Sequence, residues 1–123
     1  MRIASTVAIF VLLITGQPVA ADTPVASTLA DILLTMQHFP SDAQKATLED
    51  IAANEQVEKD LRIIAGAIGN IQHRVPDEER ASLQAIVDDP SASEAAKSLA
   101  SAALGFNHQL SADGRAALTA LGG

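Results

Sequence analysis

The chain has 123 residues, three histidines, no cysteine, and 15 acidic against 8 basic side chains, giving a formal net charge of −7. This length allows one domain or a small array of repeats and excludes a multidomain enzyme. The acidic balance argues against nucleic-acid binding, because affinity for phosphate backbones rests on Lys and Arg. The absence of Cys excludes disulfide frameworks, thiolate zinc sites and cysteine nucleophiles.

The first predicted element is a secretory signal peptide over residues 1–21. Arg2 gives a positive start, residues 3–15 form an uncharged and mostly apolar run, and small residues lead up to a cleavage point after Ala21. The apolar run is too short for a permanent membrane anchor, which needs about 20 residues. We therefore expect cleavage after Ala21 and a secreted or periplasmic protein, a bacterial periplasm being favoured because small secreted animal domains usually need disulfides.

The remaining domain, residues 22–123, contains an internal repeat. His38, His73 and His108 are all the histidines present, and each lies 35 residues after the one before. Aligned on that offset without gaps, four columns agree in all copies: Ala30/Ala65/Ala100, the histidines, Ala46/Ala81/Ala116 and Leu48/Leu83/Leu118. Other columns keep their chemical type, including a basic column (Lys45, Arg80, Arg115) and an amide before each histidine (Gln37, Gln72, Asn107). A fixed period of this length indicates a repeat architecture, with repeats at about 22–53, 54–88 and 89–123.

Each repeat predicts a long and a short helix. In the second copy the apolar residues recur in steps of four and three, which is typical of a helix packed along one seam; they are Val57, Leu61, Ile64, Ile68, Ile71 and Val75. Ser41, Pro76 and Ser111 share a column and suit the start of the short helix. Asn54 and Asp89 are expected to cap the next long helix. The six helices are expected near residues 24–38, 41–53, 55–74, 77–88, 90–109 and 112–121.

The predicted fold is therefore all-α. Three tandem 35-residue helical hairpins would form a short right-handed-type α-solenoid or a compact helical bundle, after removal of the signal peptide. The arrangement resembles helical-hairpin repeats in general, of the HEAT or armadillo kind, with a shorter period and without the motif of any named family. Glycines at 66, 69 and 105 are expected inside long helices, where they would allow neighbouring long helices to approach closely.

The histidine column has two interpretations. Three imidazoles would suit zinc, copper or nickel, so His38, His73 and His108 are candidate metal ligands. In an open array, however, equivalent residues lie roughly 8–10 Å apart, which is too far for one shared ion. The favoured interpretation is structural: each histidine would lie in the last turn of a long helix, where the helix dipole favours positive charge. The three substitutions should then have additive effects on stability.

Two functions are consistent with this reading. The leading hypothesis is an exported module that presents one face of its long helices to a protein or peptide. The residues of that face would be Asp31, Thr35, His38, Arg62, Asn70, His73, Lys97, Ser101 and His108. The alternative is a periplasmic metal-binding protein that uses the histidine column. No catalytic residues, cofactor or nucleic-acid partner are expected, and self-association through the end repeats is a further candidate interaction.

Overall fold

The computed structural model describes residues 17–122, with side-chain environments from residue 24 to residue 121, and this part of the chain is compact and all-helical. The six helices are α1 (Gln17–Thr35), α2 (Asp42–Ala53), α3 (Lys59–Gly69), α4 (Asp77–Asp88), α5 (Glu94–Leu104) and α6 (Ala112–Gly122). The described residues contain no strands, only three isolated bridges in the connections that follow the long helices. The all-α prediction is confirmed.

Helix α1 begins seven residues earlier than expected. Residues 1–16 of the predicted signal peptide lie outside the described residues, but Gln17 and Pro18, which were expected to interrupt a helix, belong to α1. A proline in the first turn is tolerated because the N–H that it lacks has no partner there in any case. None of the helices within residues 17–122 is long and apolar enough to cross a membrane.

The other two long helices are shorter than expected at both ends. Asn54 and Asp89 are not N-caps of the following helix: they are the C-caps of α2 and α4, and their side-chain oxygens accept hydrogen bonds from the N–H groups two residues further on. Such local side-chain bonds compete with helix formation. Helices α3 and α5 therefore start four residues later, at the N-caps Glu58 and Ser93.

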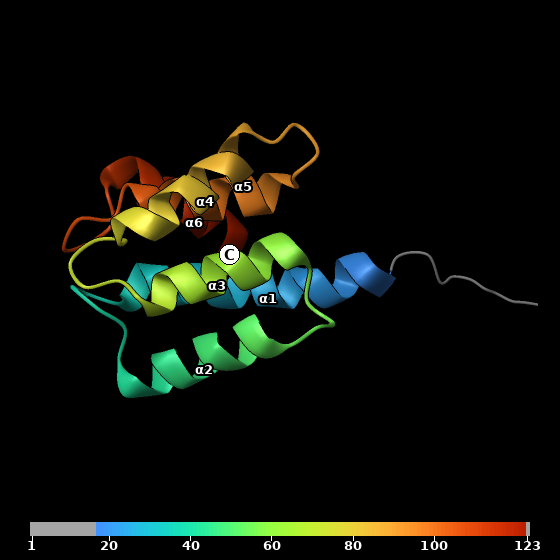
Figure 1. The fold of residues 1–123 in the computed structure, drawn as a ribbon, viewed down its shortest axis with the longest axis horizontal. Coiled ribbons are helices and arrows are strands. Elements are labelled where there is room, and N and C mark those ends of the chain that lie inside the picture. Colours follow the sequence, from blue (N-terminus) through green and yellow to red (C-terminus); the bar gives the residue numbers. More distant parts are fainter. Residues whose placement is uncertain (1–16, 123) are drawn as a thin grey trace, which may run out of the picture.

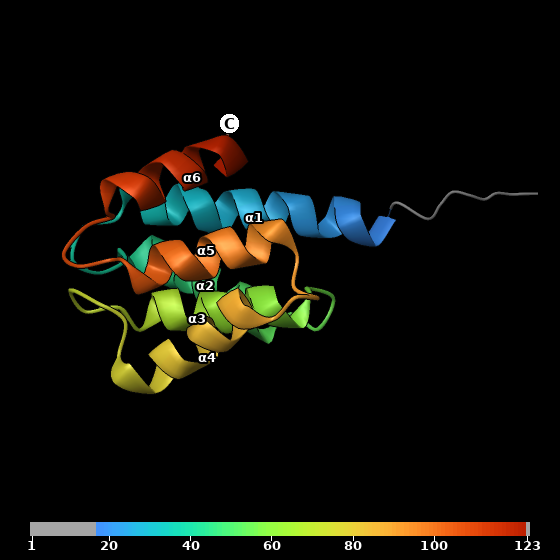
Figure 2. The same ribbon diagram turned by 90° about the horizontal axis from the view of Figure 1, so that it is seen from above.

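The helices are arranged as a closed ring (Figures 1 and 2). The long helices α1, α3 and α5 contact one another in the centre, and each short helix packs most extensively on the long helix that follows it: α2 on α3, α4 on α5, and α6 back on α1. The last contact is tied by a hydrogen bond from Ser27 Oγ to the carbonyl oxygen of Leu121, at 3.2 Å. An open solenoid is thus excluded, and of the two predicted arrangements the compact one is observed.

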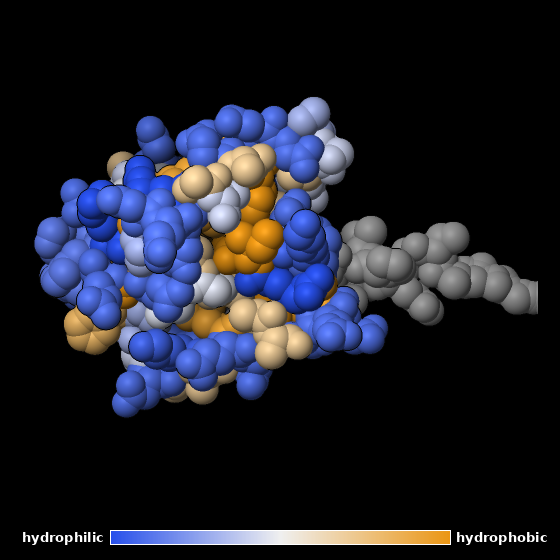
Figure 3. Space-filling model, viewed as in Figure 1, coloured by the Kyte–Doolittle hydropathy of each residue, from blue (hydrophilic) through white to orange (hydrophobic). Residues whose placement is uncertain are grey.

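The core comes from the predicted stripes. All six stripe residues of the second copy are buried, as are the leucines of the invariant Leu48/Leu83/Leu118 column. Of the two invariant alanine columns, Ala30, Ala65 and Ala100 are buried, whereas Ala46, Ala81 and Ala116 are exposed. A small side chain two residues before the buried leucine is rotated away from the core on a helix. Figure 3 shows the resulting surface, mostly hydrophilic with apolar side chains visible between the helices.

Candidate functional site

The three histidines lie in connections, not in helices. Helices α1, α3 and α5 end at residues 35, 69 and 104, so each histidine follows its helix by three or four residues and the helix-dipole interpretation is wrong. All three have positive φ, at 64°, 70° and 68°, and they are the only non-glycine residues of the described chain that do. Each is the middle residue of a three-residue turn whose first and last residues are joined by a main-chain hydrogen bond, and positive φ is strained for a residue that carries a side chain.

A closed ring of main-chain hydrogen bonds joins the three turns. The N–H of His38 donates to the carbonyl oxygen of His108 at 2.8 Å, that of His73 to His38 at 2.5 Å, and that of His108 to His73 at 2.5 Å. The three connections accordingly converge at one end of the molecule, on the left in Figures 1 and 2. Residues from the first and last repeats are thus direct neighbours, which only a closed arrangement permits.

The side chains converge as well, and we call His38, His73 and His108 the histidine cluster. The ring centroids of His38 lie 5.2 Å from His73 and 5.3 Å from His108, and those of His73 and His108 lie 4.7 Å apart. All three residues are exposed. The expected separation of roughly 8–10 Å was wrong, because it assumed stacked hairpins in an open row. The expectation of additive effects falls with it, because residues in contact couple.

A side-chain amide orients one of the imidazoles. The Nδ1 atom of His108 lies 2.9 Å from Oδ1 of Asn107. Because the amide oxygen can only accept, this contact places a proton on Nδ1, and in the neutral tautomer the lone pair is then on Nε2. Metal-binding histidines are commonly held in this way by an oxygen on their second nitrogen. Gln37 and Gln72 precede the other two histidines.

The spacing of the cluster fits a three-histidine metal site, although its ring orientation does not. A metal about 2.0–2.1 Å from each nitrogen lies about 3 Å from each ring centroid, so three tetrahedrally placed rings have centroids about 5 Å apart. The observed separations bracket that value. In the ring orientations of this structure, however, no group of three or more His, Cys, Asp or Glu side chains among the described residues could hold a metal ion. Binding therefore requires the exposed rings to rotate about their side-chain torsions.

The remaining residues of the predicted interaction face are not brought together. Asp31 and Thr35 line a groove between α1 and α2, whereas Lys97 and Ser101 line another between α5 and α6. Asn70 lies at the end of α3 and donates to Glu79 Oε1 at 2.6 Å. Arg62 is partly buried, and its Nε has no hydrogen-bond partner within the described structure. Of the predicted face, only the histidines converge.

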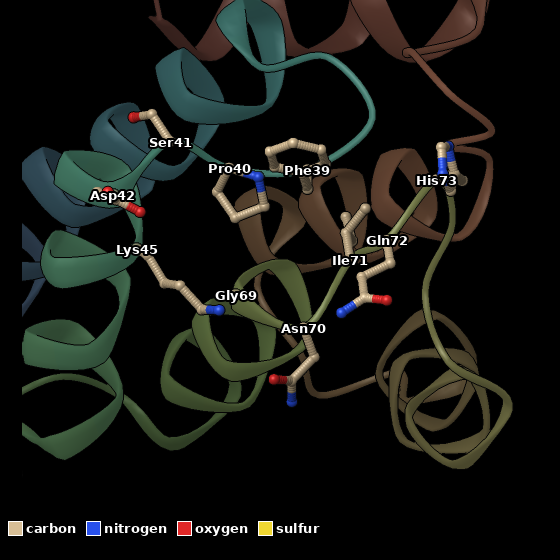
Figure 4. A pocket seen from close by; sticks show the side chains of 10 residues that line it. All are labelled: Phe39, Pro40, Ser41, Asp42, Lys45, Gly69, Asn70, Ile71, Gln72 and His73. Atoms are coloured by element: carbon tan, nitrogen blue, oxygen red, sulfur yellow. The ribbon is translucent and has the colours of Figure 1, made fainter.

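Sequence reasoning missed a hollow beside the cluster (Figure 4). It lies between the first and second repeats, has a volume of about 710 Å³, and extends from Lys45 on α2 to His73. Phe39, 59% exposed, is the only large apolar side chain that the described structure leaves exposed. A signal was available in the sequence: this hollow lies where the repeats differ, with Phe39 aligned to Arg74 and Gln109, and Gly69 aligned to two leucines.

Comparisons of the chain with models of known protein families, with curated proteins and with solved structures find no match.

Proposed function

We propose that this protein binds a divalent first-row transition-metal ion through His38, His73 and His108, in an exported, metal-handling role. The observation that carries the proposal is the convergence of the three imidazoles, with centroids 4.7–5.3 Å apart, at the centre of a closed main-chain ring. The strain supports it further, because positive φ at a non-glycine residue is costly and clusters at functional sites. Here it recurs at every histidine of the described chain.

The chemistry of the ligands selects the class of metal. Imidazole nitrogen suits zinc, copper and nickel, and three protein ligands leave one position for water or a further ligand. The contact of Asn107 with His108 Nδ1 makes Nε2 the ligand atom on that ring. The net charge of −7 raises the local concentration of cations around the molecule.

Calorimetric titration of the metal-free protein with zinc, copper and nickel tests the proposal. We expect one ion per chain, and substitution of any single histidine by alanine should weaken binding more than the 10–100-fold typical of lost supporting contacts. Asn107→Ala should weaken it by about tenfold through loss of the supporting hydrogen bond. Saturation with metal should also raise the thermal midpoint, reversibly with a chelator, because an ion that binds only the folded state stabilises it.

Arg74→Gln provides the matched control, since Arg74 is exposed and follows His73 but offers no imidazole. It should bind metal like the unchanged protein. Metal binding that survives in each single histidine variant would indicate separate sites and would reject the shared one. The same holds if the number of ions bound per chain falls by one third with each substitution. Absence of binding for all three metals would also reject it.

The proposed export rests on the sequence of residues 1–21, and Pro24 adds a structural argument. In the full chain Pro24 lies inside α1, where it removes a helix hydrogen bond. Cleavage after Ala21 would place it in the first turn, a position that favours proline. The intact mass of the protein from the periplasm of an expressing bacterium should correspond to a chain starting at Asp22. A periplasmic chain that still begins at Met1 would contradict this.

The three tandem repeats also support the first hypothesis from sequence, a module that binds a protein or peptide. It ranks second because its proposed residues line separate grooves. The hypothesis of self-association through the end repeats also loses support, because α1 and α6 already contact each other within one chain. The two functions differ in one readout: a metal role depends on the histidines, whereas a helix-face partner would depend on residues such as Asp31 and Lys97.

A further inference from the structure

The hollow between the first and second repeats arises from a missing side chain. Gly69 ends α3 and lines the hollow, whereas its equivalents in the other repeats are Leu34 and Leu104. Close packing does not require this glycine: a Cβ atom there would lie 3.8 Å from Leu48 Cβ, an ordinary contact. The expected role in close approach of long helices is therefore not observed. What the glycine does instead is leave open the space that a leucine would occupy.

The cation at the same junction is also left without a partner. In the basic column, Arg80 donates to the carbonyl oxygen of Leu104 at 3.2 Å and Arg115 to that of Leu34 at 3.4 Å. The ammonium group of Lys45, the third member, makes no hydrogen bond or ion pair with any residue that the structure describes, and Lys45 lines the hollow. Its ammonium group is directed toward the end of α3 at Gly69 (Figure 4).

A negative charge and an apolar wall complete the hollow. Asp42 lies three residues before Lys45 on α2 and, within the described chain, pairs neither with it nor with another cation. Phe39 and Pro40 form the apolar wall, and Gln72 supplies an amide near it (Figure 4). The Asn70 amide points away and donates to Glu79 Oε1. An exposed phenylalanine is not required by the fold, since the equivalent positions carry Arg74 and Gln109. The hollow thus offers one cation, one anion and one aromatic surface.

We propose that this hollow binds a free α-amino acid with a large apolar side chain. The ligand's carboxylate pairs with Lys45, its ammonium group with Asp42, and its side chain packs on Phe39 and Pro40. A volume of about 710 Å³ falls within the range of small-molecule sites. The charges favour a zwitterion, because a simple anion would leave Asp42 beside its carboxylate and a simple cation would face Lys45. The site does not depend on metal at the histidine cluster.

The test is a nuclear magnetic resonance titration of the ¹⁵N-labelled protein with L-phenylalanine, in the presence of a chelator. Saturable shifts are expected around Phe39, Lys45 and Gly69 at ligand concentrations up to about 10 mM, the range of a weak small-molecule complex. 3-Phenylpropionate lacks the ammonium group and phenethylamine lacks the carboxylate, so each should bind about tenfold more weakly. A probe that binds as tightly as phenylalanine without one of its charges would overturn the assignment.

Variants separate the contacts. Lys45→Ala should weaken phenylalanine about tenfold without weakening phenethylamine, whereas Asp42→Ala should weaken phenylalanine about tenfold without weakening 3-phenylpropionate. Gly69→Leu, which introduces the residue of the other two repeats, should abolish binding by filling the hollow. Gly66→Ala is its control, because a Cβ at residue 66 meets no atom within 4 Å.

Circular dichroism verifies that each variant folds. If Gly69→Leu does not fold, Phe39→Ala replaces it, because Phe39 is exposed and its substitution leaves the core intact. Phe39→Ala should weaken phenylalanine binding at least about tenfold, since aromatic contact supplies the side-chain recognition. No saturable shifts, or equal binding by the Lys45→Ala and Asp42→Ala variants and the unchanged protein, would overturn the proposal. Because metal is absent throughout, neither result bears on the histidine cluster.

Discussion

A histidine at φ near +65° has its Cβ in conflict with its own backbone, at a cost of roughly 1–2 kcal/mol relative to the right-handed region. His38, His73 and His108 all adopt this conformation. Glycine would serve the turn better, since it reaches positive φ without a Cβ clash. The turn therefore explains the backbone geometry but not the imidazole, and the side chains are what the proposed metal site uses.

His73→Gly and His73→Ala separate these two contributions. Both variants should lose metal binding, but the glycine variant should be more stable by about 1 kcal/mol, because alanine retains the Cβ clash at φ 70°. Urea unfolding followed by circular dichroism measures the difference. Gln72, which has no positive φ, is the control. At this position the Gln72→Gly variant should be less stable than the Gln72→Ala variant. If alanine were the more stable residue at position 73, the strain argument would be wrong.

The environment of Asp89 favours the charged form of its carboxyl group. Hydrogen bonds from the Ser91 hydroxyl at 2.7 Å and the Ser91 N–H at 2.9 Å hold the pKa of Asp89 below its ordinary value of 3.8. Desolvation opposes this lowering of the pKa, and Lys97 adds a lowering effect smaller than that of desolvation. Because the folded-state pKa is the lower one, the stabilisation is present above the unfolded-state value and is lost as pH falls through the folded-state value.

Asp89→Asn should consequently be less stable than the unchanged protein at neutral pH, and the difference should shrink as the pH falls below about 4. Thermal unfolding across this pH range measures it. Asn54 occupies the equivalent position and accepts the same kind of bond, from the Gln56 N–H at 2.9 Å, without a charge. Asn54→Ala should thus cost stability by an amount that does not change over the same range. A constant difference for Asp89→Asn would contradict the assignment.

At the scale of elements, the basic column links neighbouring repeats. Arg80 on α4 and Arg115 on α6 each donate to a carbonyl oxygen at the last turn of the following long helix, which for α6 is α1. Terminal carbonyls of a helix lack partners within it, and cations are favoured beside them. The same side chains therefore cap one helix and fix the position of another.

Arg80→Ala should lower the free energy of unfolding by about 0.5–1.5 kcal/mol, the usual net contribution of one such hydrogen bond. Lys45→Ala is the natural comparison, since Lys45 belongs to the same column but makes no such bond within the described chain; it should cost less. Chemical unfolding of both variants gives the result. Equal losses would mean that the stems of these side chains, and not their hydrogen bonds, stabilise the junctions.

At the scale of the molecule, closure makes the contact of α6 with α1 equivalent to the contacts of α2 with α3 and α4 with α5. The C-terminal end of α6 lies close to the part of α1 around Ser27, because the Ser27 hydroxyl donates a hydrogen bond to the carbonyl oxygen of Leu121. We therefore treat this junction as a packed junction like the other two.

A circular permutant tests closure. It would run from Asn54 to Gly123, continue through a linker of about five residues, and end with residues 24–53, so that the buried Val57 and the N-cap Glu58 are kept. We expect the same helical content and a single unfolding transition, because only one peptide bond of a short loop is broken and a loop of about the same length is closed at the other junction. A molten or multiphase transition in urea, monitored by circular dichroism, would show that the α6–α1 junction is weaker than the others.

The sequence by itself determined the local features of this protein. The steps of three and four in the apolar stripe correctly predicted the helix class, the six helices of residues 17–122 and most of the buried residues, such as Leu61 and Leu83. These features depend on neighbours within one or two helical turns, which the sequence displays directly. Helix ends were predicted less well, because the side chains of Asn54 and Asp89 can stabilise either a cap or a turn.

Only the tertiary structure decided where the repeats lie relative to one another. Helices with similar apolar stripes can stack in an open row or close into a ring, and their local sequence patterns are the same in both cases. Closure depends on α6 packing on α1 across almost the whole chain, and it moves His38 and His108 from separate repeats to a centroid distance of 5.3 Å. The candidate site is a product of that long-range packing, which is why residue spacing alone argued against it.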